Sequence, residues 1–139
     1  MPYSSNLPAI TSRMKAARGQ GLLAAAAVVE NEVKERLRGG YTSGDFVTGA
    51  SLAAVAHSEP QEDGEGAFIL VGTNLFYNLF WELGHMNLFT HRFERKEVWM
   101  PALLSTRQQQ LAAFQRVYQT TLDDDASDQR VTASPRSPR

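Results

Sequence analysis

The strongest constraint on the fold is the spacing of apolar residues in the segment from Thr11 to Arg38. They recur at steps of three and four residues and so share one helix face; they are Leu22, Leu23, Ala26, Val29, Val33 and Leu37. Thr11 or Ser12 can cap the helix start, and Gly39-Gly40 ends it. Gly19 and Gly21 each cost about 1 kcal/mol relative to alanine. We therefore expect a helix over this segment, either throughout or only after Gly21.

Strand signals follow the predicted helix. Residues 51–58 alternate imperfectly between apolar and polar side chains and predict a strand, with a helix as the rival because of their alanines. Residues 59–66 (EPQEDGEG) combine a proline, two glycines and four acids, which predicts an exposed hairpin loop. Residues 67–72 (AFILVG) form the clearest strand, since they are β-rich and bounded by glycines.

The second half of the chain begins with aromatic residues and ends with a second helix. Residues 73–84 (TNLFYNLFWELG) fit either a bent strand or a short helix, and residues 85–97 predict a charged, aromatic loop. Pro101 fits the first turn of a helix that runs to about Leu122. Its expected inward residues are Leu104, Leu111, Phe114 (or Ala113), Val117 and Tyr118.

These elements predict an α+β fold, in which a long N-terminal helix and a C-terminal helix pack on a small antiparallel β-sheet with a hairpin. We expect one domain over residues 11–122. Residues 1–10 carry two prolines and several turn formers and predict a flexible arm. Residues 123–139, acidic and then rich in Ser, Pro and Arg, predict a disordered tail.

Composition narrows the class of protein. The chain has 139 residues, no cysteine and a net charge of −1, so a disulfide framework or a cysteine zinc site is excluded. A balanced charge also provides no long-range attraction for nucleic acid or membranes. The longest apolar run, residues 21–29, is too short to span a bilayer, and the N-terminus lacks a signal-peptide core. We expect a protein that is soluble and cytoplasmic when made.

Candidate catalytic or metal-binding groups are sparse. Glu82, His85 and His91 lie within ten residues and could hold a metal, but their spacing matches no helical two-histidine motif. The acids of the hairpin tip resemble catalytic carboxylates only in number, because catalysis needs one of them in an apolar setting; they are Glu59, Glu62, Asp63 and Glu65. We expect them to be solvated and to face a partner. No cofactor is predicted.

The aromatic residues between positions 76 and 99 outnumber what one small core can use. We therefore predict that several face a neighbouring subunit; the candidate interface residues are Phe76, Phe80, Trp81, Phe89, Phe93 and Trp99. Arg92, Arg95 and Lys96 lie among them and could touch nucleic acid, although Glu94 and Glu97 cancel most of their charge. They are candidate contacts to a channel or a loop.

The segment from Val71 to Leu104 resembles the tail-component (neck or tail-completion) family of long-tailed bacteriophages. The resemblance is carried by Thr48-Gly49, Val71-Gly72, Tyr77 with Glu82-Leu83-Gly84, and Trp99-Met100-Pro101-Ala102-Leu103, in that order. It extends over about residues 12–122. Leu83 stands where the family usually has an aromatic residue, and His85 where threonine is common.

The resemblance implies a non-enzymatic virion protein that forms a homo-oligomeric, six- or twelvefold ring at the head–tail connector. Its expected partners are copies of itself, neighbouring connector and tail proteins and, weakly, DNA in the channel, with no membrane. Its expected location is the virion, after assembly in the host cytoplasm. The alternatives are a tail terminator ring, a small metal-dependent enzyme or a nucleic-acid-binding module that uses Glu82, His85 and His91.

Overall fold

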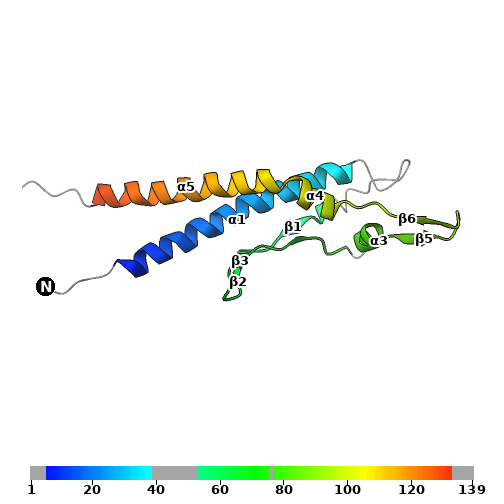
Figure 1. Ribbon diagram of the computed structural model, residues 1–139, viewed down its shortest axis with the longest axis horizontal. Coiled ribbons are helices and arrows are strands. Elements are labelled where there is room, and N and C mark those ends of the chain that lie inside the picture. Colours follow the sequence, from blue (N-terminus) through cyan, green and yellow to red (C-terminus); the bar gives the residue numbers. More distant parts are fainter. Residues whose placement is uncertain (1–5, 39–52, 76, 133–139) are drawn as a thin grey trace, which may run out of the picture.

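The computed structural model describes residues 6–38, 53–75 and 77–132 of the chain and has an α+β fold (Figure 1). Two long helices, α1 (Leu7–Arg38) and α5 (Arg107–Thr132), lie side by side and run in opposite directions. Short antiparallel strand pairs lie on one side of this helix pair. The predicted fold class is therefore confirmed.

Helix α1 is continuous through both of its glycines. It begins at Leu7, so residues 7–10, which we expected in a flexible arm, form its first turn. Thr11 is not the cap we expected, because its hydroxyl donates to the carbonyl of Leu7 at 2.8 Å inside the helix. Gly21 is buried against α5, where a Cβ atom would come within 2.7 Å of the Phe114 ring. A glycine that weakens the isolated helix thus allows the close approach of α5.

The first β-ribbon is built from two strand pairs. β1 (Ala56–His57) pairs with β4 (Val71–Gly72), and β2 (Gln61–Glu62) pairs with β3 (Ala67–Phe68), both antiparallel. The hairpin predicted around residues 59–66 is thus confirmed. The strand predicted over residues 67–72 is interrupted at Ile69 and Leu70, where the Ser58 amide donates to the Leu70 carbonyl at 2.8 Å.

The strand predicted over residues 51–58 was too long. Of its described part, only Ala56–His57 is a strand and Ala53 is helical, while residues 51–52, like the Thr48-Gly49 turn, lie outside the described residues. The alanines that made a helix the rival account for this mixed outcome.

A second hairpin replaces the loop that we predicted over residues 85–97. Helix α3 (Tyr77–Leu83) leads into β5 (His85–Asn87), which pairs antiparallel with β6 (Arg92–Glu94). The Asn87 side chain accepts hydrogen bonds from the amides of Phe89 and Thr90, and His91 has φ = 54°. Asparagine in this role closes a turn locally, so an apparently irregular stretch folds back on itself.

The predicted second helix is two helices. α4 (Trp99–Ser105) contains Pro101, and Thr106 separates it from α5, which begins at Arg107. α5 continues to Thr132, so residues 123–132, which we expected in a disordered tail, are helical. Ala113 is buried, as expected, but Leu104 and Leu111 are more than half exposed, so their inward placement was wrong.

The core is small and lies toward the C-terminal end of α1. It consists of Val29, Val33, Leu37, Val55, Val98 and Ala102, with Val71 and Trp99 packed against it. The C-terminal half of the α1 stripe thus packs against the start of α4 and against Val55 and Val71 of the first β-ribbon region. None of the helices in the described part of the chain is long and apolar enough to cross a membrane.

Candidate interaction surface

Glu82 ties α3 to the start of α4. Its carboxylate accepts backbone N–H groups from Val98 at 2.7 Å, Trp99 at 3.1 Å and Met100 at 2.9 Å. These are donors that a helix start leaves without intrahelical partners, and the positive end of the helix dipole favours the negative carboxylate. The carboxylate of Glu82 therefore acts as an N-cap supplied from another helix.

Two further contacts hold the β5–β6 hairpin in place. The Lys96 amide donates to the Trp81 carbonyl at 3.0 Å, and Arg95 Nε donates to the Glu82 carbonyl at 3.0 Å. The segment directly after β6 is thus hydrogen-bonded to α3, and β5 continues from α3 through Gly84. The hairpin projects from the fold in a defined direction, away from the first β-ribbon (Figure 1).

Gly84 and Phe93 meet at the base of this hairpin. Gly84 has φ = 93°, and a Cβ atom there would overlap the Phe93 ring. Glycine is the residue that adopts this backbone conformation without strain, and here it also leaves space for the ring. On the neighbouring position, His85 stacks edge-on against Trp81, with ring centroids 4.5 Å apart, and its Nε2 lies 3.7 Å from Glu94.

The tip of the hairpin exposes large apolar side chains. Phe89 is 97% exposed and Leu88 is 79% exposed. Nine of the fourteen large apolar side chains that are exposed in the described residues lie between Leu79 and Leu104. Such a concentration of exposed apolar surface is typical of an interaction site.

The structure separates the six predicted interface residues into groups. Phe76 lies outside the described residues, as does the side chain of Phe80. Phe89 is free of the fold, whereas Phe93 covers Gly84 and is still 63% exposed. Trp81 contacts His85 and Trp99 packs on the core, so both are at least partly structural.

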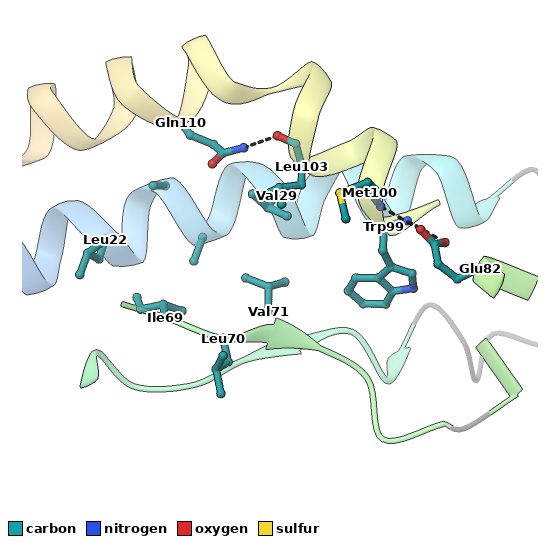
Figure 2. A pocket seen from close by; sticks show the side chains of 12 residues that line it. Leu22, Val29, Ile69, Leu70, Val71, Glu82, Trp99, Met100, Leu103 and Gln110 are labelled. Atoms are coloured by element: carbon teal, nitrogen blue, oxygen red, sulfur yellow. Dashed lines mark hydrogen bonds between the residues drawn. The ribbon is translucent and has the colours of Figure 1, made fainter. Parts of the chain in front are cut away.

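A groove opens between the helix layer and the first β-ribbon (Figure 2). It has a volume of about 500 Å³, and its walls are almost entirely apolar. Leu22 and Val29 of α1, Val71 of β4, and Trp99 and Leu103 of α4 line it. Its volume lies within the range of pockets that hold small molecules or partner side chains, about 300–1,000 Å³.

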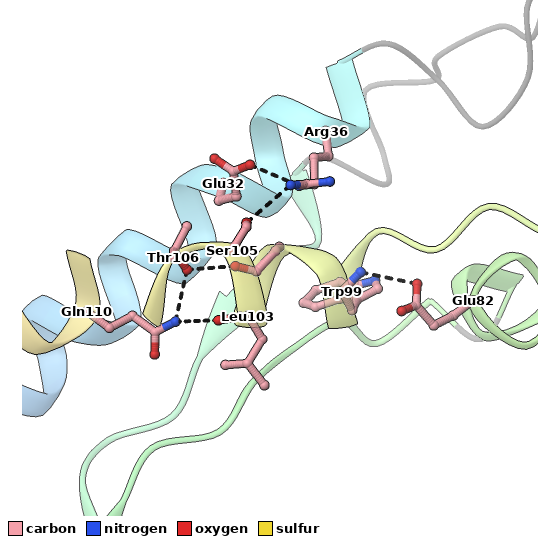
Figure 3. A network of polar contacts seen from close by, with 9 residues as sticks. Glu32, Arg36, Glu82, Trp99, Leu103, Ser105, Thr106 and Gln110 are labelled. Carbon is pink, nitrogen blue, oxygen red and sulfur yellow. Dashed lines mark hydrogen bonds and ion pairs between the residues drawn. The ribbon is translucent and has the colours of Figure 1, made fainter. Parts of the chain in front are cut away.

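Polar contacts at the α4–α5 junction keep the helical wall of the groove in shape (Figure 3). Gln110 Nε2 donates to the Leu103 carbonyl at 2.8 Å and to the Thr106 hydroxyl at 2.9 Å. Thr106 is buried and donates to the Ala102 carbonyl at 2.6 Å. Arg36 links α1 to the same junction through Ser105 at 3.2 Å. The end of α4 is thus satisfied by side chains, and Leu103 is held at the groove.

The acidic side chains predicted at the first hairpin tip are exposed there: Glu59, Glu62, Asp63 and Glu65. Glu62 pairs with Arg18 and, at 3.8 Å, with Lys15 of α1. Asp63 accepts the amides of Glu65 at 3.0 Å and Gly66 at 2.9 Å. These hydrogen bonds lower the pKa of Asp63 because they favour its charged form. The tip therefore keeps negative charge that faces solvent.

The basic residues Arg92 and Arg95 of the second hairpin region differ from each other in their contacts. Arg95 pairs with Glu97 in addition to its bond to α3. Arg92 is exposed and pairs across the strands with Asn87 in the β-register. Arg92 is the only lysine, arginine or acidic residue between Leu88 and Phe93. The hairpin tip is thus apolar with a basic edge.

Glu82, His85 and His91 do not form a site together. Both oxygens of Glu82 bind backbone amides, His85 faces Trp81 and Glu94, and His91 lies at the hairpin turn. Among the described residues, no group of three or more His, Cys, Asp or Glu side chains is placed to hold a metal ion. The glutamate that suggested a ligand serves as a helix cap.

The groove and the role of Glu82 were missed by reasoning from the sequence. A glutamate seventeen residues before the first residue of a helix has no local capping signature, because the known one spans three residues. The groove is lined by residues of α1, β4 and α4, which are distant in the sequence, so no local pattern indicates it. Gly84 did carry a signal, since a glycine directly after a short helix often has positive φ.

Comparisons with models of protein families, with curated proteins and with solved structures found no match.

Proposed function

We propose that this chain is a non-enzymatic structural subunit that assembles with copies of itself into a ring at the head–tail junction of a tailed bacteriophage. The observation that carries the self-assembly is the exposed apolar surface on and beside the β5–β6 hairpin, above all Phe89 and Leu88. Water-exposed phenylalanine and leucine at a rigid tip favour association, since burying them removes apolar area from water.

The place of the ring in a virion rests on the family resemblance of residues 12–122 alone. The order of its elements agrees with that resemblance: a long helix with basic residues in its last turn, a hairpin, a short aromatic helix and a final helix entered through Trp99 to Leu103. The same resemblance is the basis for expecting neighbouring connector and tail proteins above and below the ring. It does not distinguish a neck ring from a tail-completion or tail-terminator ring.

Three measurements test this proposal. Native mass spectrometry and negative-stain electron microscopy of the purified chain are expected to show a closed ring rather than a distribution of aggregates. Gold-labelled antibody to the chain is expected to mark the head–tail junction of phage particles made in cells that express it. A chain that stays monomeric at all concentrations and is absent from particles contradicts the proposal.

A further inference from the structure

We propose that the copies join through one repeated contact, in which the tip of the β5–β6 hairpin of one copy docks into the groove between α1, β4 and α4 of the next. This inference rests on the proposed function, because it names the surfaces by which the ring would form. Each surface is complete within one copy, so the contact needs no further component.

The hairpin tip has the properties of a preformed anchor. Phe89 is 97% exposed, and the turn that carries it is closed by the Asn87 side chain. The segment that follows β6 is also hydrogen-bonded to α3, from which β5 continues through Gly84. A rigid anchor loses little conformational freedom on docking, so more of the burial energy appears as affinity. Aromatic anchors of this kind dominate many interfaces.

The groove has the matching shape and chemistry. Its walls are mainly apolar, with Glu82 and Gln110 as the polar lining residues, and at about 500 Å³ it has room for the Phe89 side chain and part of Leu88. Leu70 at its edge is 60% exposed and Leu103 is 44% exposed, so insertion of an aromatic ring would remove apolar surface of both copies from water.

The hairpin of the same copy is directed away from this groove. The contacts of Glu82, Trp81 and Arg95 fix the base of the hairpin, and its tip projects beyond α3 on the far side from the first β-ribbon (Figure 1). The occupant must therefore come from another molecule. Because the tip and the groove are different surfaces, the contact is head-to-tail, which is the geometry that closes into a ring.

Charge complementarity favours a second copy over other occupants. The groove lining includes Ile69 and Leu70, which follow the acidic segment of residues 59–66 after strand β3, and the Ser58 amide next to Glu59 donates to the Leu70 carbonyl. The incoming tip carries Arg92 on its basic edge, without an acidic residue between Leu88 and Phe93. Opposite charges at the rim would steer association and set its orientation. A small apolar molecule would gain nothing from this arrangement.

Complementary variants test the contact. Phe89→Asp leaves the groove intact and spoils the tip, whereas Leu103→Lys leaves the tip intact and places a charge in the groove. Each is expected to weaken self-association by about tenfold or more and to prevent rings. An equal mixture of the two is expected to form dimers and nothing larger, since each mixed pair retains one intact contact. Native mass spectrometry measures all three samples.

Controls separate the docking from a folding defect. Leu111→Lys introduces the same charge at an exposed leucine of α5 outside the groove, and it is expected to leave assembly unchanged. Leu70→Lys is a second groove variant for the case that Leu103→Lys fails to fold, as judged by circular dichroism.

The outcomes distinguish this inference from the proposed function. If the wild-type chain forms rings and Phe89→Asp forms them equally well, the docking contact is wrong and the ring survives. Failure of the mixture to form dimers overturns the head-to-tail pairing, as does a tightly held small molecule found in the groove of the assembled ring. A wild-type chain that is always monomeric overturns both proposals.

Discussion

Glu82 connects α3 to the start of α4 through three backbone hydrogen bonds. Replacement by Gln removes the charge and turns one acceptor into a donor that faces backbone N–H groups. Because hydrogen bonds to charged groups contribute about 1.5–3 kcal/mol, we expect Glu82→Gln to lower the free energy of unfolding by about 2 kcal/mol in urea titrations. Glu97→Gln, at an exposed pair with Arg95, is the control and is expected to change it by less than about 0.5 kcal/mol. Equal effects of the two variants would contradict the capping role.

The two glycines of α1 offer a matched pair of substitutions with opposite expected signs. A Cβ atom at Gly19 would lie 3.6 Å from Pro60, an ordinary contact, so Gly19→Ala should stabilise the protein by about 0.5–1 kcal/mol through helix propensity. At Gly21 the same atom would lie 2.7 Å from the Phe114 ring. The overpacking, about 1–3 kcal/mol, outweighs the gain in propensity, so Gly21→Ala should destabilise it by about 1 kcal/mol.

Thermal melts of both glycine variants measure whether each substitution raises or lowers the stability of the protein. Recovery of stability in the double variant Gly21→Ala with Phe114→Leu would identify the ring as the cause. If both single substitutions stabilise the protein, α5 yields at this point and the close approach of the helices matters little.

At the scale of elements, the acidic hairpin is expected to respond to pH through Asp63. Its pKa is lowered from 3.8 by the amides of Glu65 and Gly66, so the charged form is bound more tightly in the folded turn than in the unfolded chain. The contribution is fully present above about pH 4 and is lost as the pH falls through the lowered pKa. Carbon-13 NMR titration should show Asp63 titrating below its usual value, with the Glu65 and Gly66 amides shifting alongside. A normal pKa for Asp63 would contradict the turn geometry.

The elements that could be predicted from the sequence are those with local signals. The α1 stripe and the acidic hairpin follow from spacing and turn residues within a few positions, whereas the same signals left residues 73–84 open between a bent strand and a short helix. The β5–β6 hairpin was missed because its turn depends on the Asn87 side chain and on the left-handed conformation of His91, neither of which has a glycine signal. The break at Thr106 was missed because nothing in the local sequence forbids a continuous helix there.

The candidate site could be predicted only in part for the same reason. Phe89 was one of six interface candidates chosen from aromatic density, and it is the most exposed of the large apolar residues in the described chain. The groove could not be found, since its walls come from residues about 80 positions apart in α1 and α4. Leu104 and Leu111 were placed inward from periodicity, but α1 covers a different face of these helices, which leaves both exposed.

At the scale of the whole molecule, a small core and a large exposed apolar surface imply that association contributes to stability. When only folded copies bind one another, a higher protein concentration shifts the equilibrium toward the folded state and so raises the melting temperature. We therefore expect the melting temperature of the wild-type chain to rise across a hundredfold concentration range, and that of Phe89→Asp to stay constant.

Val33→Ala separates the core from the surface in the same experiment. Val33 is fully buried, so its truncation leaves a cavity and should lower the melting temperature by roughly 5–10 °C at every concentration. The concentration dependence should persist, because the hairpin tip and the groove are untouched. Scanning calorimetry at several concentrations measures both effects. If Val33→Ala abolishes the dependence while Phe89→Asp retains it, the exposed residues have no part in association, and the stability of the assembled protein resides in the core alone.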